Sequence, residues 1–447
     1  MKNPPCLPSH RLVRIFLPLA LIFITTVVVI SVRSAGLTES THRLNGAGQM
    51  VKAAASVTTP MASIIVNTTD DALDSNDGKC SFREALIHAN FDGGPIGIPG
   101  ECAPGSGDDT ISIPVSGTIN LSSELPAIST NMTIIGSGSD RLTIRRDTGG
   151  DYRILTIDNL TTVSISGVTL KNGRASSPSS GGGIGTGGIL TLTSVIVTEN
   201  TTTDGVTGSP SAGSGGGICN CGSGSLTMID SVVSNNTTGN GVVGASGNGN
   251  GGRGGGIESS APITVINTLV TGNTTGTGPG GSGSGAGLFV GFQATIINST
   301  FSGNMTGAAP ADGGGIWISG NSTITNTTVT GNLASGSGHG IFAGFTGTTV
   351  RNTIVARNGS NGPDIGGASF TTAGHNLIGD ADGSTGFTNS LNGDQVGSTT
   401  NPINPRLGPL LFNGGIFETH GLLPGSPAID AGDNCVLTNS CSPALGS

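Results

Sequence analysis

The feature that most constrains this chain is an internal repeat that starts near residue 181 and continues to about residue 360. Six blocks open with Gly-x-Gly and an aliphatic residue, and an asparagine follows that residue sixteen to eighteen positions later. The aliphatic residues are Ile184, Ile218, Ile257, Leu288, Ile316 and Ile341. The asparagines are Asn200, Asn236, Asn273, Asn304, Asn332 and Asn358. Periods of this length are typical of solenoids, in which each unit buries its apolar face against its neighbours.

A second polar position lies six residues before each of these asparagines. It is occupied by Ser194, Asp230, Asn267, Asn298, Asn326 and Asn352. Each is a small polar residue that can hydrogen-bond the backbone at a bend. We therefore interpret each repeat as one coil, with Val, Ile and Thr pointing inward and the two polar columns stacked as ladders along the axis. The predicted fold class is all-β: a right-handed parallel β-helix with one short N-terminal capping helix.

The repeats differ in length at one position only. From each asparagine to the next aliphatic mark, the spacing changes from 18 and 21 residues to 15, 12 and then 9 along the chain. Insertions at one position per repeat map to loops on one face of a solenoid. The longest of these loops, 201–213 and 237–252, are rich in Gly, Ser and Asn, and their composition predicts mobility.

The composition fits a core of stacked aliphatic side chains. The chain has 79 glycines but only 3% aromatic residues, and the absence of a G-X-Y period excludes collagen. The regular blocks of Val, Ile, Leu and Thr argue against a disordered low-complexity chain. The net charge is −9, and the Lys and Arg residues from 181 to 360 are Arg253, Arg351 and Arg357. With no basic stripe, nucleic acid is not an expected partner.

The N-terminus predicts export. Basic residues at positions 2, 11 and 14 precede an uncharged run over residues 15–32, which is the pattern of a secretory signal. Residues 1–34 are therefore a signal peptide or an N-terminal membrane anchor, because an uncharged, mainly apolar run of eighteen residues also approaches the length of a membrane span. The sequence leaves cleavage and retention open. In both cases the protein is secreted or on the cell surface, and this segment is its only membrane contact.

Four further segments follow the N-terminal segment. Residues 35–62 are small and polar and are interpreted as a linker. Residues 63–104 form an N-terminal cap, in which Ser81 and Glu84 make a capping box that starts a helix. Residues 105–360 hold the β-helix repeats. Residues 361–447 are rich in proline and form a C-terminal cap, because prolines interrupt central strand pairing and a solenoid needs its open end covered.

Six of the seven cysteines follow the apolar segment and fall into three local pairs. Even numbers at short spacing favour disulfides in an oxidising compartment. The natural pairings are Cys80–Cys102 and Cys435–Cys441. A bridge between Cys219 and Cys221 would be strained, so their disulfide state stays open.

Three stretches resemble known bacterial families. Residues 80–85 (CSFREA) resemble the CSLREA motif at the start of exported bacterial β-helix proteins, with Phe in place of Leu. The Gly-Gly-Gly-Ile blocks resemble polymorphic outer-membrane-protein repeats, whose Phe-x-x-Asn motif residues 301–304 (FSGN) match, although the other repeats lack that Phe. Residues 376–433 are similar to the choice-of-anchor Q segment, which ends in LPGSPAIDAG as residues 423–432 do. These resemblances imply a secreted or surface-displayed protein with a pectin-lyase-like β-helix.

No catalytic residues are predicted. Polysaccharide lyases of this fold use acidic calcium sites with a basic residue, and the related hydrolases use clustered aspartates. Here the acidic residues of the repeats fall on different coils, and Gly-His-Gly at 338–340 stands where other repeats have Gly-Gly-Gly. Four aspartates in one loop are candidate calcium ligands, because calcium prefers oxygen donors, although a solvated loop is the favoured interpretation. They are Asp70, Asp71, Asp74 and Asp77.

The sequence therefore favours a structural or binding protein over an enzyme. We expect a monomer with no resident cofactor other than this candidate calcium, presenting loops to an extracellular protein or polysaccharide and serving an adhesive role. The alternative is a β-helix carbohydrate-active enzyme, a polysaccharide lyase or a glycoside hydrolase. Three or more carboxylates converging with a Lys or Arg on one groove would favour that alternative.

Overall fold

The computed structural model describes residues 42–44, 50–52, 62–74, 76–91, 101–176, 178–245, 247–359, 362–438 and 440. The chain divides into two compact units, Met1–Val57 and Thr58–Ser447. In the first unit, β1 (His42–Leu44) pairs antiparallel with β2 (Met50–Lys52). Within the described residues, no helix has the length and apolarity needed to cross a membrane. The apolar run 15–32 lies outside the described residues.

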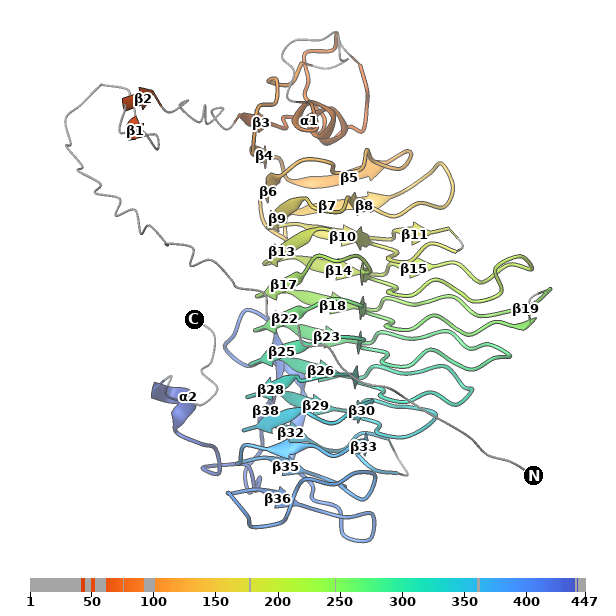
Figure 1. Cartoon of the computed structure of the whole chain (residues 1–447), viewed down its shortest axis with the longest axis vertical. Coiled ribbons are helices and arrows are strands. Elements are labelled where there is room, and N and C mark those ends of the chain that lie inside the picture. The colour runs from red at the N-terminus through yellow and green to blue at the C-terminus, as the bar shows by residue number, and fades with distance from the viewer. Residues whose placement is uncertain are drawn as a thin grey trace, which may run out of the picture. The chain divides into compact units, whose positions relative to one another are not determined.

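The second unit is a right-handed parallel β-helix, as the repeat predicts. Its coils stack one below the other in chain order (Figure 1). Each full coil contributes one strand to each of three parallel sheets, in the order third sheet, first sheet, second sheet. The Gly-x-Gly-aliphatic block enters the third sheet, and the ladder asparagine follows the strand of the second sheet.

The strands of the three sheets are short. The first sheet consists of β3 (Ser63–Ile65), β4 (Asp109–Ile113), β6 (Met132–Gly136), β9 (Thr162–Ser166), β13 (Ile189–Thr193), β17 (Leu226–Ile229), β22 (Ile263–Ile266), β25 (Ala294–Ile297), β28 (Thr323–Thr325), β31 (Thr349–Arg351) and β34 (Thr371–Thr372). The second sheet consists of β5 (Gly117–Leu121), β7 (Leu142–Arg146), β10 (Thr169–Lys171), β14 (Ile196–Thr198), β18 (Val232–Ser234), β23 (Leu269–Thr271), β26 (Thr300–Ser302), β29 (Thr328–Thr330), β32 (Ile354–Val355), β35 (Leu377–Ile378) and β36 (Gln395–Val396). The third sheet consists of β8 (Leu155–Ile157), β12 (Ile184–Thr186), β16 (Ile218–Asn220), β21 (Ile257–Ser259), β24 (Leu288–Val290), β27 (Ile316–Ile318), β30 (Ile341–Ala343) and β33 (Ile365–Gly367).

The core is a column of aliphatic side chains inside the coils. The parallel register stacks similar side chains of successive coils on one another. Ile184 lies over Ile218, which lies over Ile257. All three are fully buried. Because side chains alternate between the two faces of a strand, the residue between two inward positions points outward. The coils continue past the predicted limit at residue 360, since β33 to β36 extend the same sheets to Val396.

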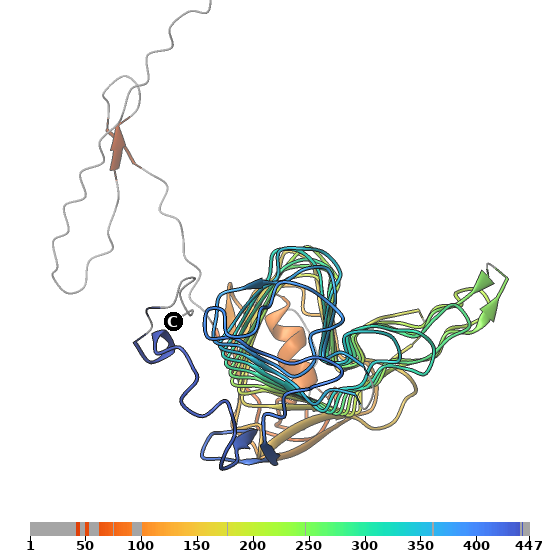
Figure 2. The ribbon, with the colours of Figure 1, turned by 90° about the horizontal axis from the view of Figure 1, so that it is seen from below.

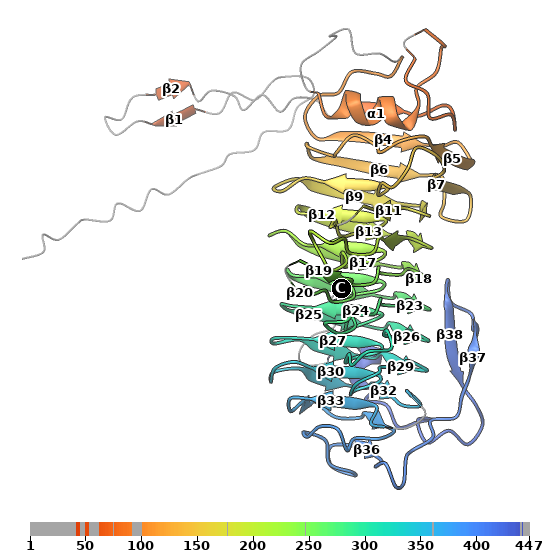
Figure 3. The same cartoon turned by 90° about the vertical axis from the view of Figure 1, so that its right-hand side faces the viewer.

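The N-terminal end of the coils is covered by α1 (Phe82–Ala89), which lies across the first coil in Figure 3. The predicted capping box is present: the Ser81 hydroxyl accepts from the Glu84 amide, and the Glu84 carboxylate accepts from the Ser81 amide. The Cys80–Cys102 disulfide joins this cap to the segment that leads into the first coils.

The C-terminal segment turns back along the outside of the coils. A hairpin of β37 (Leu407–Phe412) and β38 (Glu418–Leu422) runs beside the second sheet (Figure 3). His420 on this hairpin holds it there, because its Nε2 is hydrogen-bonded to the Ser302 hydroxyl of β26 at 2.9 Å. A four-residue helix, α2 (Cys435–Thr438), follows. Cys435 is disulfide-bonded, and its predicted partner Cys441 lies outside the described residues.

Candidate functional site

The six asparagines that follow the strands of the second sheet form a buried ladder, which we call the inner ladder. Their side chains are 0 to 3% exposed. In each step, the side-chain Nδ2 donates to the Oδ1 of the next asparagine at 2.8 to 3.0 Å, and the backbone amide donates to that same oxygen at 2.9 to 3.1 Å. Unpaired buried polar groups are costly, so each asparagine depends on its neighbours in the ladder.

The second polar column forms an outer ladder between the first and second sheets. All six residues, Ser194 included, have φ between 46° and 54°, which turns the chain within one residue. This conformation favours Asn and Asp among non-glycine residues. From Asn267 onward, each Nδ2 donates to the preceding member at 2.5 to 3.1 Å, so this ladder runs opposite to the inner one.

Both ladders end on a carboxylate at their accepting end. The inner ladder ends at Asp364, whose Oδ1 accepts from Asn358 Nδ2 at 2.9 Å. The outer ladder ends at Asp230, which accepts from Asn267. An ionised carboxylate accepts hydrogen bonds and donates none, so it closes a chain of donors without needing a further partner. Asp230 therefore has a structural role in this arrangement.

The long loops stack into a layered projection, which we call the fin. It comprises residues 201–214, 237–245, 247–253 and 274–284, and the shorter connections 305–312 and 333–337 continue it along the axis. Figure 2 shows the fin projecting from one side of the coils. The composition predicts mobile loops, but the structure hydrogen-bonds each layer to the next: the Gly205 amide donates to Asn240 O, and the Gly241 amide to Thr277 O, both at 2.8 Å.

Buried threonines hydrogen-bond the two ends of each long loop to each other at the base of the fin. Thr202, Thr238 and Thr275 are each 2% exposed. Their hydroxyls donate across the loop to a glycine carbonyl at 2.6 to 2.7 Å and accept from the next layer's glycine amide at 2.9 to 3.1 Å. Sequence reasoning missed this column, although its signal is plain: a threonine recurs two residues after a ladder asparagine. These Asn-x-Thr sequences are structural, because the asparagine amide is buried in the ladder.

Glycines let the layers of the fin approach each other. A Cβ atom at Gly252 would collide with the Gly213 carbonyl, and one at Gly283 would collide with the Gly252 carbonyl. On the opposite side of the fin, glycines of successive layers also lie too close to the neighbouring backbone for a Cβ atom to fit. The glycine content of the loops is therefore a packing requirement of stacked backbones, and the fin is a built element of the fold.

A second distinctive feature lies on the outward face of the third sheet. The middle residues of successive strands form a column there: Gly185, Cys219, Glu258, Phe289, Trp317 and Phe342. The Phe289 and Trp317 rings stack with centroids 4.4 Å apart, and the Arg253 guanidinium lies 4.4 Å from the centre of the Phe289 ring. Because stacked rings cover each other's faces, this column stabilises the sheet more than it offers stacking faces to a sugar.

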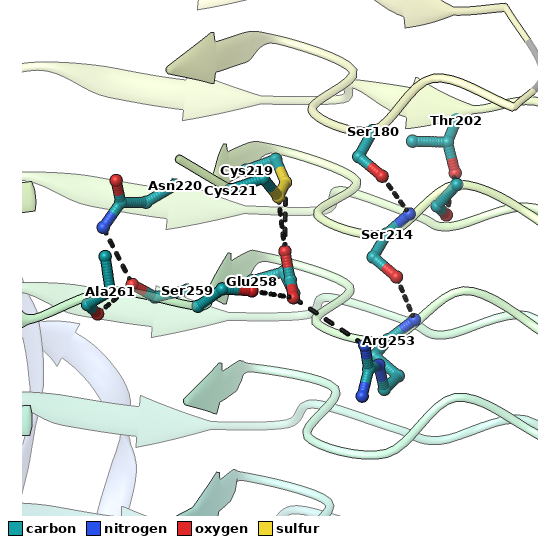
Figure 4. Close-up of a disulfide and its surroundings, with 12 residues drawn as sticks. Ser180, Thr202, Ser214, Cys219, Asn220, Cys221, Arg253, Glu258, Ser259 and Ala261 are labelled. Atoms are coloured by element: carbon teal, nitrogen blue, oxygen red, sulfur yellow. Dashed lines mark hydrogen bonds and ion pairs between the residues drawn. A yellow bond between two sulfur atoms is a disulfide. The ribbon is translucent and has the colours of Figure 1, made fainter. Parts of the chain in front are cut away.

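Cys219 and Cys221 form a disulfide beside a buried carboxyl group (Figure 4). Glu258 Oε2 lies 3.0 Å from Cys219 Sγ and 2.6 Å from Cys221 Sγ. Glu258 is 3% exposed. Burial raises the pKa of the Glu258 carboxyl, while the Arg253 guanidinium and the Ser260 hydroxyl oppose that shift. The disulfide also lines a cavity of about 280 Å³ that Arg153 shares.

The described residues hold one group of three side chains whose potential ligand atoms lie within 4.8 Å of one another, namely Cys219, Cys221 and Glu258. A disulfide offers no thiolate, and thiolate is the form in which cysteine binds metals. In the state seen here, this group is therefore a disulfide next to a carboxyl group and not a metal centre.

The structure does not bring the four candidate calcium ligands together as one site. Asp71 forms a salt bridge with Arg83 at 2.8 Å, and Asp70 forms one with Lys79 at 2.7 Å. Asp74 and Asp77 accept from backbone amides within their own turn. The loop is organised by local pairs, and the Asp71–Arg83 pair also ties α1 to the first coil, since Arg83 donates to the Ser123 and Glu124 carbonyls.

Comparisons with known proteins find distant structural likenesses. No family model matches the chain, and no curated protein matches it. Among solved structures, it is similar to the A-module of the mannuronan C-5 epimerase AlgE4 of Azotobacter vinelandii, with 14% identity, a TM-score of 0.38, and coverage of 66% of this chain and 89% of that one. It is also similar to ORF18 of Geobacillus virus E2, with 10% identity, a TM-score of 0.31, and coverage of 80% of this chain and 66% of that one. At these values the likenesses carry no argument about this chain's activity, and the fold rests on its own sheet topology.

Proposed function

We propose that this protein is a secreted or cell-surface β-helix scaffold that binds an extracellular partner through its fin and has no catalytic role. The fin carries the proposal, because it is an ordered projection that the coils do not need in order to stack. The shortest connection, residues 333–337, closes a coil without a long projecting loop. A chain that keeps layered loops beyond this minimum presents a defined surface, and binding residues are commonly placed on loops held by a rigid scaffold.

Export is supported by the cysteines. The structure joins Cys80 to Cys102 and Cys219 to Cys221, and such bonds persist in oxidising compartments. Together with the predicted N-terminal signal over residues 1–34, this favours a location outside the cytoplasm. The resemblances to CSLREA and choice-of-anchor Q proteins point the same way and remain predictions, since no family model matches.

The surface chemistry of the fin indicates the kind of contact it can make. Its exposed groups are mainly hydroxyls, amides and backbone atoms, with few charges, and Val206 and Val243 are 52% and 70% exposed. Such a surface recognises a partner through neutral hydrogen bonds and small apolar contacts. An uncharged polysaccharide or a protein of the cell envelope fits it better than a polyanion does.

The test compares the exported body, residues 58–447, with a trimmed variant. In that variant, residues 201–214 and 237–253 are each replaced by the chain's own short connection, residues 333–337. Both proteins are tested for saturable binding to immobilised neutral and acidic polysaccharides and to bacterial envelopes, with and without calcium. We expect the trimmed variant to bind at least about tenfold more weakly while circular dichroism shows the same β-rich fold.

Two outcomes would contradict the proposal. Equal binding by a folded trimmed variant would show that the fin is not the binding element. Release of reducing ends or unsaturated sugars from the polysaccharides would establish the alternative, a β-helix carbohydrate-active enzyme. Dependence on calcium would direct attention to the loop of Asp70, Asp71, Asp74 and Asp77.

A further inference from the structure

The Cys219–Cys221 disulfide joins two sulfurs with very different surroundings. Cys219 is the central residue of β16 and is 1% exposed, whereas Cys221 lies just beyond the strand and is exposed. Glu258, on β21 of the next coil, lies within 3.0 Å of both sulfurs. Figure 4 shows the carboxyl group facing the sulfur pair. The Sγ of Cys221 is therefore accessible to an external thiol. The Sγ of Cys219, which would be the leaving group, is buried beside the Glu258 carboxyl group.

The bond spans two residues of one chain segment and ties together no distant parts of the fold. In the chain-entropy model, the stabilisation from a disulfide grows with the length of the loop it closes. Cys80–Cys102 closes a loop with a separation of 22 residues and anchors the N-terminal cap, but Cys219–Cys221 has no comparable structural task. The β16 strand is already held in register by β12 and β21.

We propose that Cys219–Cys221 is a thiol–disulfide exchange site for a low-molecular-weight thiol, with Cys221 as the attacked sulfur and Glu258 as the proton donor to Cys219. The adjoining cavity of about 280 Å³ has room for a small molecule. Arg153 lines that cavity, and its cationic group favours the approach of a thiolate. This inference does not depend on the proposed binding function of the fin.

The exchange proceeds in two balanced steps. An external thiolate attacks Cys221 Sγ, the S–S bond breaks, and the electron pair passes to Cys219 Sγ, which takes the proton of the Glu258 carboxyl. A second external thiolate then attacks the external sulfur of the mixed disulfide, releasing Cys221 as a thiolate that is protonated from water. The protein disulfide gains two electrons, and two external thiols become one external disulfide. In the reverse direction, the Glu258 carboxylate accepts the proton from Cys219.

The setting of Glu258 suits this role. The charged groups around it are Arg253, whose guanidinium lies 3.9 Å from Oε1, and, on the far side of the disulfide, Arg153 and Asp158 of the cavity. Burial raises its pKa, so the protonated carboxyl persists at a higher pH than that of an ordinary glutamic acid. A carboxyl group beside the sulfurs that keeps its proton to a higher pH than usual can deliver it to a leaving thiolate.

The test measures the rate at which each disulfide is reduced in the folded, full-length protein. The protein is treated with glutathione or dithiothreitol without denaturant, quenched by alkylation, and analysed by peptide mass spectrometry. We expect Cys219–Cys221 to open at least about a hundredfold faster than Cys80–Cys102, which serves as the internal control. The Cys219→Ser variant, treated with oxidised glutathione, should carry the mixed disulfide at Cys221.

Glu258→Gln provides the second readout. We expect it to slow opening by at least about tenfold and to flatten the dependence of the rate on pH, while Glu199→Gln, an exposed carboxylate on a neighbouring coil, leaves both unchanged. Three results would each overturn the proposal: free thiols at Cys219 and Cys221 in the unreduced protein, opening no faster than that of Cys80–Cys102, or an unaltered rate and pH profile in a folded Glu258→Gln variant.

Discussion

The coils and the fin both stack layer on layer along the same axis, but with different residues. In the coils, neighbouring layers meet through aliphatic side chains inside and asparagine ladders at the bend. In the fin, they meet backbone to backbone, with glycines at the contacts and threonine hydroxyls at the base. Side-chain packing specifies one register strongly, since a shift would misplace every apolar residue. Packing of backbone against backbone requires only that the residues at the contact have no Cβ atom, and it does not specify the register in the same way. The coils can therefore serve as the invariant scaffold, while the length of the fin varies from layer to layer.

The largest expected effect is loss of an inner-ladder asparagine. Asn273→Ala removes the oxygen that accepts from both the backbone amide and the side chain of Asn236. The buried Asn236 amide then lacks a partner and its Nδ2 keeps only the Val197 carbonyl, so we expect the free energy of unfolding to fall by about 4 kcal/mol. The control is Asn267→Gly in the outer ladder, which keeps the positive φ and opens no buried donor. Chemical denaturation would contradict the account if both variants lost similar stability.

A pH effect should follow from Asp364, which ends the inner ladder. Burial raises the pKa of its carboxyl from 3.8 to about 6. Because the folded state holds the proton more tightly than the unfolded chain does, this contribution is complete below pH 3.8 and is lost as the pH rises through 6, with a total of about 3 kcal/mol. Asp364→Asn should remove that part of the slope. Denaturation midpoints between pH 4 and 8 measure it, and parallel slopes for the two proteins would refute the assignment.

A smaller and local effect is expected in the fin. Gly252→Ala places a Cβ against the Gly213 carbonyl, so the layers must separate, at a local cost of about 1 to 2 kcal/mol. Gly208→Ala is the matched control, because a Cβ there meets no atom within 4 Å. Limited proteolysis should cut the fin of the first variant faster and leave its coils intact. Equal cleavage of the two variants would mean that the fin layers are not packed as described.

The sequence was sufficient for the coils because their signals are periodic. The Gly-x-Gly-aliphatic blocks, the two polar columns and the capping box of Ser81 and Glu84 each indicate a local geometry, and the structure has that geometry. The extent of the coils was underestimated at residue 360, because the later strands are two or three residues long and lie among glycines and prolines. Such strands carry too few apolar positions to show a period.

The order of the fin was not predicted, since glycine-rich composition indicates flexibility when each loop is considered alone. Its packing depends on contacts between loops about 37 residues apart, as in the bond from the Gly239 amide to Thr202 Oγ1. The disulfide site was hidden for a related reason. Glu258 and Cys219 are 39 residues apart in sequence and become neighbours only through the register of β16 and β21.

The most direct test of the account is hydrogen exchange of the fin in the native protein, read by mass spectrometry on overlapping peptides. The amides of Gly205, Gly241 and Gly251 donate to carbonyls of neighbouring layers. We predict that peptides containing them exchange at least about a hundredfold more slowly than an unstructured chain, approaching the protection of the coil strands. Exchange at the rate of an unstructured chain would contradict the central claim, because the fin would then be a set of mobile loops and not an ordered surface for binding.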